Sequence, residues 1–197
     1  TPKLREDAPL EAFGGGLEQS FALKAMKDFA SKIKSDADHV AVLEAEKRLN
    51  DFETKFLYDP NDGAFVKQGK NAFDLPNSLN EQFQKEYDSI SEGLTSVSQQ
   101  QKFDERSMQR KHYLDKAIRN HVATEIQKYD EETTKSYIDS EKNAAILNYQ
   151  DPTRIQAAAT NIANEVQKQG ERHGLPPEMV TLKQQNLISE MHTGVVS

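Results

Sequence analysis

Five histidines are the first side chains to consider for metal binding or acid–base chemistry, because imidazole titrates near neutral pH and binds transition metals. They are His39, His112, His121, His173 and His192. No two of them are three or four residues apart, and none belongs to an HExxH pattern. The spacing therefore predicts no metal site, and His121, which faces the apolar side of its expected helix, is interpreted as a packed histidine.

The acidic loop DPNDG, residues 59–63, has carboxylates at the spacing of a calcium-binding loop. An EF-hand loop needs glycine at its sixth position and an acid at its twelfth. This chain has Ala64 and Lys70 at those positions. The pattern therefore favours a structural turn over a calcium site. The residues expected to shape that turn are Asp59, Pro60, Gly63 and Gly69.

Three further chemistries are not supported by the residue spacing. The triple glycine at residues 14–16 is not followed by the Lys-Ser/Thr pair of a phosphate-binding loop. No serine lies in a GxSxG elbow, and the chain has no cysteine to serve as nucleophile or metal ligand. We therefore expect no catalytic residue, no cofactor and no metal, and we interpret the chain as a protein that is not an enzyme.

Composition and charge limit the kinds of partner. The 197 residues carry a net charge of -7, and no basic run stands out that could read nucleic-acid phosphates. No apolar run approaches the roughly 20 residues that cross a bilayer, and no signal peptide is visible. Hydrophobic content is 36%, which is normal for thin helical bundles because each helix buries only one stripe.

The stretch that organises the chain is residues 98–149, which contain neither glycine nor proline. One unbroken helix there would be about 75 Å long at about 1.5 Å per residue, so we expect an elongated molecule. Ser98 and Gln101 have the spacing of a capping box at its start. The irregular, aromatic stripe favours antiparallel packing within the chain over a parallel dimeric coiled coil. Its expected packing residues include Tyr113, Ile118, Val122, Tyr129 and Tyr137.

Shorter helices are expected on either side of this stretch, over residues 17–57, 77–92, 152–173 and 177–191. The first has one apolar face in this interpretation, and the SDAD segment at residues 35–38 leaves open one kinked helix or two. That face comprises Phe21, Met26, Phe29, Ile33, Val40, Leu43, Leu49, Phe52 and Phe56. The fold class predicted is all-α, an elongated antiparallel helical bundle. A flexible arm over residues 1–16 precedes one bundle domain over residues 17–197, and we expect both to be part of a longer polypeptide.

Three segments carry a resemblance to a known family. They are AFGGG at residues 12–16, FLYDPNDGAFVKQGKNAF at residues 56–73, and HGLPPEMVTLKQQNLISEMHTGVV at residues 173–196. In this order they resemble a family of large, helix-rich proteins that tailed bacteriophages and prophages encode. Members of this family are virion structural, internal or tail-associated proteins, and some carry a lytic transglycosylase domain elsewhere in the chain.

The resemblance implies a phage virion structural or assembly protein that packs through its helices against other virion proteins or other copies of itself. It implies a virion location after synthesis in the host cytoplasm, with which the lack of cysteine is consistent. For residues it implies only structural roles, in which Gly63 and Gly69 shape the turn and Ala72 packs closely. Two alternatives stay open. One is a non-catalytic helical segment of an ejected cell-wall-degrading phage protein, and the other is a cellular coiled-coil scaffold.

Overall fold

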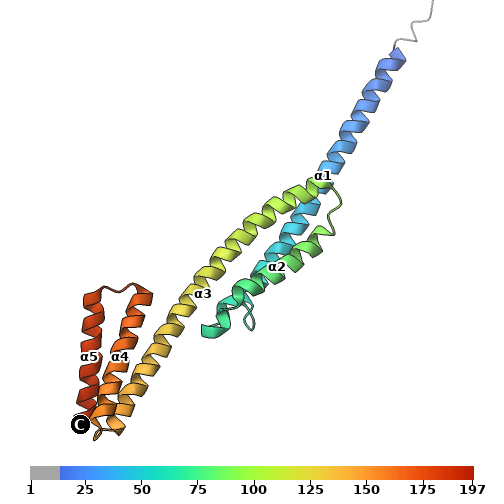
Figure 1. The fold of residues 1–197 in the computed structure, drawn as a ribbon. Coiled ribbons are helices and arrows are strands. Elements are labelled where there is room, and N and C mark those ends of the chain that lie inside the picture. The colour runs from blue at the N-terminus through green and yellow to red at the C-terminus, as the bar shows by residue number, and fades with distance from the viewer. Residues whose placement is uncertain (1–13) are drawn as a thin grey trace, which may run out of the picture. The chain divides into compact units, whose positions relative to one another are not determined.

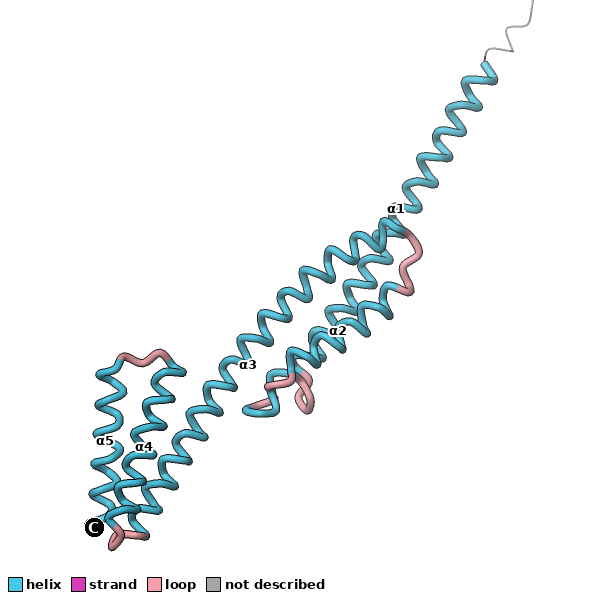
Figure 2. Tube along the Cα trace, in the orientation of Figure 1, coloured by secondary structure: helices cyan, strands magenta, loops and turns pink. Residues whose placement is uncertain are grey.

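The computed structural model describes residues 14–197, and every regular element in that range is helical (Figures 1 and 2). The expected all-α fold is therefore confirmed. Most of the predicted N-terminal arm, residues 1–16, lies outside the described residues. The elements are α1 (Gly14–Tyr58), η2 (Ala64–Val66), η3 (Gly69–Ala72), α2 (Leu75–Ser91), α3 (Val97–Leu147), α4 (Pro152–His173) and α5 (Pro177–Val196), where η marks short 3-10 helices.

The long helix α3 is continuous over 51 residues, which confirms the central expectation from the sequence. Its cap lies two residues before the expected one. The Ser96 hydroxyl accepts a hydrogen bond from the Gln99 backbone N–H at 3.1 Å, and the Gln99 side-chain oxygen accepts one from the Thr95 N–H at 2.8 Å. Ser96 and Gln99 have the same spacing as the expected pair, and each side chain accepts a hydrogen bond from a backbone N–H group at the helix start, although Gln99 bonds Thr95 and not the cap residue itself.

The expected single bundle domain over residues 17–197 corresponds to two compact units. In the described chain, unit 1 contains residues 14–66 and 74–119, and unit 2 contains residues 67–73 and 120–197. Helix α3 contributes its first part to unit 1 and its second part to unit 2.

Unit 1 is a three-helix arrangement of α1, α2 and the first part of α3 (Figure 1). The Phe52 ring on α1 lies edge-on to the Phe83 ring on α2, with 6.0 Å between centroids. The Tyr87 ring on α2 stacks on Phe103 of α3 at 5.4 Å. Side chains from all three helices therefore meet in one interior. Its buried apolar side chains include Val42, Ala45, Leu49, Phe56, Leu57, Leu79, Phe83, Ile90, Phe103, Leu114 and Ile118.

Unit 2 packs the second part of α3 against the α4–α5 hairpin. The core is formed by Ile138, Ala145, Ala158, Ala159, Ile162, Val166, Val180 and Met191. Helix α4 begins where Asp151 accepts hydrogen bonds from two backbone N–H groups. It ends at Gly174, whose φ of 65° is the left-handed conformation that favours glycine. The Leu175 N–H reaches the Gly170 carbonyl at 2.9 Å, which completes the C-terminal cap expected from the sequence.

Candidate interaction surface

The predicted turn at residues 59–63 uses its acidic side chain internally. The Asp59 carboxylate accepts hydrogen bonds from the backbone N–H groups of Asn61 and Asp62 at 2.8 and 3.0 Å, and these bonds hold the pKa of Asp59 below its usual value. Pro60 lies within the same turn. A Cβ at Gly63 would lie 2.5 Å from the Asp59 carbonyl oxygen, so the turn needs glycine there.

Gly69, the last predicted turn residue, lies in unit 2 against α3. Its φ is 52°, and its N–H donates a hydrogen bond to the Glu125 carboxylate at 3.0 Å. Lys128 binds the other carboxylate oxygen at 2.9 Å. The Gly69 N–H, and after it Lys128, hold the pKa of Glu125 below its usual value. Sequence reasoning missed Glu125, although its position three residues after Val122 places it on the apolar side of α3.

The predicted packing stripe of α3 divides into buried and exposed residues. Ile118 and Val122 are buried, at 0% and 8% exposure. Tyr129 is half-buried, with its ring edge-on to Phe73 at 5.8 Å between centroids. The Tyr113 and Tyr137 side chains are 54% and 42% exposed, so these two tyrosines lie outside the core.

The histidines do not converge on a common site. Among residues 14–197 no group of three or more His, Asp or Glu side chains is placed to hold a metal ion. His173 lies 2.8 Å from the Asp130 carboxylate, and Arg172 binds the same carboxylate at 2.9 Å. His121 lies 2.9 Å from the carbonyl oxygen of Lys67, to which its Nε2–H donates. Both histidines thus have structural partners.

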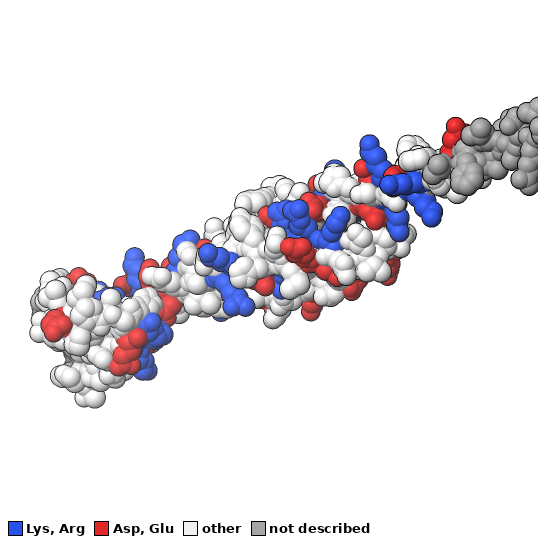
Figure 3. Space-filling view, turned by 90° about the horizontal axis from the view of Figure 1, so that it is seen from above, with Lys and Arg blue, Asp and Glu red and all other residues white. Residues whose placement is uncertain are grey.

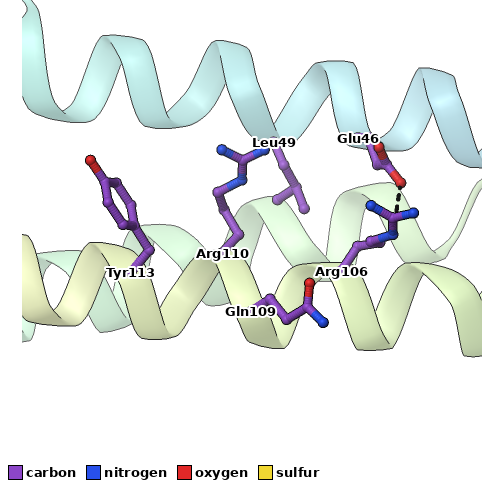
Figure 4. Close-up of a pocket in the computed structure, with 6 residues that line it drawn as sticks. All are labelled: Glu46, Leu49, Arg106, Gln109, Arg110 and Tyr113. Carbon is purple, nitrogen blue, oxygen red and sulfur yellow. Dashed lines mark ion pairs between the residues drawn. The ribbon is translucent and has the colours of Figure 1, made fainter.

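A small hollow lies between α1 and α3 in unit 1 (Figure 4). Its volume is about 190 Å³, which is below the roughly 300–1,000 Å³ of ligand pockets. Arg106 pairs with Glu46 at 3.4 Å and Arg110 pairs with Glu53 at 2.9 Å, so its two arginines already connect the helices. The lining residues are Glu46, Leu49, Arg106, Gln109, Arg110 and Tyr113. We interpret this hollow as part of the packing of unit 1.

A larger groove of about 740 Å³ lies in unit 2 between α3 and the α4–α5 hairpin. Ile138 and Leu187 contribute apolar surface to it. Lys142 spans it to Glu190 at 2.6 Å, and Lys183 donates to the Gln169 side-chain oxygen at 2.6 Å. Two of its lysines are therefore already bound within the unit. On the visible face in Figure 3, basic and acidic side chains are likewise interspersed.

The most unusual surface of the described chain is the first half of α1. Every side chain from Glu18 to Ala37 is exposed, and the first buried one is Asp38. Phe21 and Met26 are each 70% exposed and Phe29 is 66% exposed. In Figure 1 this part of α1, drawn in blue, extends past the ends of α2 and α3. A contiguous apolar surface of this kind marks an interaction site far more often than scattered surface residues do.

The apolar residues of α1 form two faces, so the single face predicted from the sequence is wrong. Val40 is 53% exposed and Val42 is 5% exposed, although both lie on one helix two positions apart. Two positions rotate a side chain by about 200° around an α-helix. Val42, Ala45, Leu49 and Phe56 therefore face the bundle, and no other element among residues 14–197 covers the opposite face. We call that uncovered face the free stripe; it comprises Ala22, Met26, Phe29, Ile33, Val40 and Leu43.

Comparison of this chain with models of known protein families, with curated proteins and with solved structures gives no match. None of the helices in the part of the chain that the structure describes has the length and apolar character to cross a membrane. The class defined by the fold is thus an all-α protein with a long uncovered helical face.

Proposed function

We propose that this chain is a non-catalytic assembly protein that docks onto another protein chain through the free stripe of α1. The observation that carries the proposal is the exposure of every side chain from Glu18 to Ala37, Phe29 at 66% and Met26 at 70% among them. Full burial of each such side chain contributes about 1.5–3 kcal/mol. Most helical stability in proteins comes from tertiary packing of an apolar face, so a docked partner would also stabilise the helix itself.

The setting we propose is a bacteriophage virion, as an internal or tail-associated component. Support for this setting comes from the order of the three sequence segments described above. The elongated surface of a helix suits such a role, because side chains along one face can bind a neighbour without an enclosed pocket. In this proposal the chemistry is packing, and the chain itself performs no bond cleavage.

The experiment compares phage particles assembled with the wild-type chain and with the double variant Phe29→Glu/Ile33→Glu. We expect mass spectrometry of purified particles to find the wild-type chain and to find the double variant strongly depleted. Ser31→Glu is the matched control, because Ser31 is also exposed but lies two positions, about 200° around the helix, from each of Phe29 and Ile33. Particles that lack the wild-type chain would contradict the virion setting. Equal incorporation of the double variant would contradict docking through the free stripe.

A peptidoglycan zymogram tests the non-catalytic part of the proposal. We expect no zone of clearing with the purified chain. Clearing would show that the chain itself degrades the cell wall and would replace the assembly proposal.

A further inference from the structure

The occupant of the free stripe can be inferred from the way charge is distributed along α1. Residues 24–34 contain four lysines and one aspartate, and residues 35–45 contain three acids and neither lysine nor arginine. The basic half belongs to the uncovered part of the helix, and the acidic half runs along the start of the bundle. Each half is therefore complementary to the other half of a second copy, provided that the two helices run in opposite directions.

We propose that two copies of this chain pair through an antiparallel coiled coil of their α1 free stripes, centred between Lys34 and Ser35. This inference rests on the proposed function, because it names the partner that docks on the free stripe. The pairing would place Met26 opposite Leu43 of the second copy and Phe29 opposite Val40. Both halves of the stripe are then covered at once in each copy.

The spacing of the free stripe fits this kind of packing. Ala22, Met26, Phe29 and Ile33 follow one another at intervals of four, three and four residues, and Val40 and Leu43 continue the same seven-residue repeat. This repeat keeps one seam of a helix against a partner helix. Since α2 and α3 pack on the opposite face of α1, the seam stays accessible alongside the bundle.

The position that interrupts the repeat, Asp36, determines the direction of pairing. In a parallel pair Asp36 would face Asp36 of the second copy, which places like charges together in the seam. In the antiparallel pair Asp36 of one copy faces Ile33 of the second copy, next to Lys32 of that second copy. Both Lys32 and Asp36 are exposed in this chain. A polar residue at a seam position is a known means of specifying register and orientation.

The two free acids on or beside the seam are Asp36 and Glu44, both of which are exposed. Asp38 instead accepts a hydrogen bond from Gln99 at 2.7 Å, and Glu46 pairs with Arg106 at 3.4 Å, so these two already serve unit 1. In the proposed pair, Asp36 and Glu44 would therefore form the ionic contacts with the second copy, and the contacts within unit 1 would remain.

Cysteine cross-linking of the full chain tests the direction directly, because the chain has no cysteine of its own. A disulfide needs Cα atoms within about 7 Å. In the antiparallel pair, a mixture of Met26→Cys and Leu43→Cys chains should give a mixed disulfide, and neither variant alone should cross-link efficiently. In a parallel pair each variant would cross-link with itself, and the mixed disulfide would have to span about 25 Å. Self-cross-linking of the separate variants would overturn the antiparallel arrangement.

Sedimentation equilibrium measures the pairing itself. We expect a species of twice the 22.3 kDa chain mass. Phe29→Glu/Ile33→Glu should weaken association by about a hundredfold or more, and Ser31→Glu should leave it unchanged. Lys32→Glu alone should weaken it, and Lys32→Glu combined with Asp36→Lys should restore it. Circular dichroism confirms that the variants keep their helices.

The outcomes separate this inference from the proposed function. A chain that stays monomeric over about two orders of magnitude in concentration, but whose Phe29→Glu/Ile33→Glu variant is excluded from particles, overturns self-pairing and supports docking onto another protein. A dimer that the double variant leaves intact places the contact elsewhere and overturns the pairing. If that variant also enters particles normally, the proposed docking through the free stripe fails as well.

Discussion

A Cβ placed on Gly170 of α4 would lie 2.5 Å from Cγ2 of Val180 on α5, so the hairpin closes at a position where only glycine fits. We expect Gly170→Ala to lower the free energy of unfolding by about 1–2 kcal/mol, because overpacking of about 1–3 kcal/mol outweighs the gain in helix propensity of up to about 1 kcal/mol. Chemical denaturation followed by circular dichroism measures the change.

Gly16→Ala is the matched control, since nothing lies within 4 Å of a Cβ at that helical position. It should be neutral or stabilising by up to about 1 kcal/mol. Gly170→Ala/Val180→Ala should be more stable than the sum of its single changes predicts, because the smaller side chain makes room. Strict additivity would show that the two residues do not compete for space.

The Glu125 carboxylate should make stability depend on pH. Its pKa lies below the ordinary 4.5, first because it accepts the Gly69 N–H and then because of Lys128. The charged form is thus favoured in the folded state, and its contribution is present above about pH 4.5 and is lost as the pH falls through the lowered pKa. Glu125→Gln should be less stable than wild type at pH 7, and the difference should shrink between about pH 5 and pH 3.

Denaturation curves at several pH values measure this convergence. Glu132→Gln removes the same charge from an exposed position on α3 and is the control. A constant difference between wild type and Glu125→Gln across this range would show that Glu125 keeps the same protonation behaviour on folding.

A side-chain hydrogen bond between Asp38 and Gln99 joins α1 to the start of α3. Both side chains are buried, and the Gln99 amide donates to the Asp38 carboxylate at 2.7 Å. Gln99→Leu leaves a buried carboxylate with one donor fewer, which we expect to cost about 1–3 kcal/mol. Gln101→Leu, at an exposed position of the same helix, should change stability by less than about 0.5 kcal/mol. Equal effects of the two changes in urea denaturation would contradict a buried polar contact.

The Asp151 cap should stabilise the first turn of α4 and with it the folded chain. Its carboxylate accepts hydrogen bonds from the Thr153 and Arg154 N–H groups at 3.0 and 3.2 Å. Asp151→Ala should cost about 0.5–2 kcal/mol, and Asp151→Ser should stay near wild type because it keeps an acceptor. Thermal unfolding of the three proteins checks the ranking, and a serine variant as unstable as the alanine variant would argue against capping.

The helix ends of unit 2 were predictable because they depend on local chemistry. Asp151 followed by Pro152 starts a helix, and Gly174 followed by Leu175 ends one, whatever lies nearby in space. The continuity of α3 follows in the same way from the absence of glycine and proline. Periodicity also placed Ile118 and Val122 on the apolar side of this helix.

The exposed apolar face of α1 was not predictable, because the covering of an apolar face is a tertiary property. Val40 and Val42 are the same residue type in one helix, and only the positions of α2 and α3 make one exposed and the other buried. Glu125 shows the same limit for charge. Its partner Gly69 lies 56 residues away in the sequence, so no local sequence pattern could predict the hydrogen bond between them.

Because the start of α1 is exposed, hydrogen exchange can measure directly whether a partner is bound to it. Residues 21–36 are exposed and no other described part of the chain covers them, so the protection of their backbone amides rests on local helix formation and should be close to that of an isolated helical peptide. Amides near Leu49 are held by the buried side of unit 1 and should exchange far more slowly. A partner that binds the start of α1 would slow hydrogen exchange of its amides there and leave exchange of the amides near Leu49 unchanged.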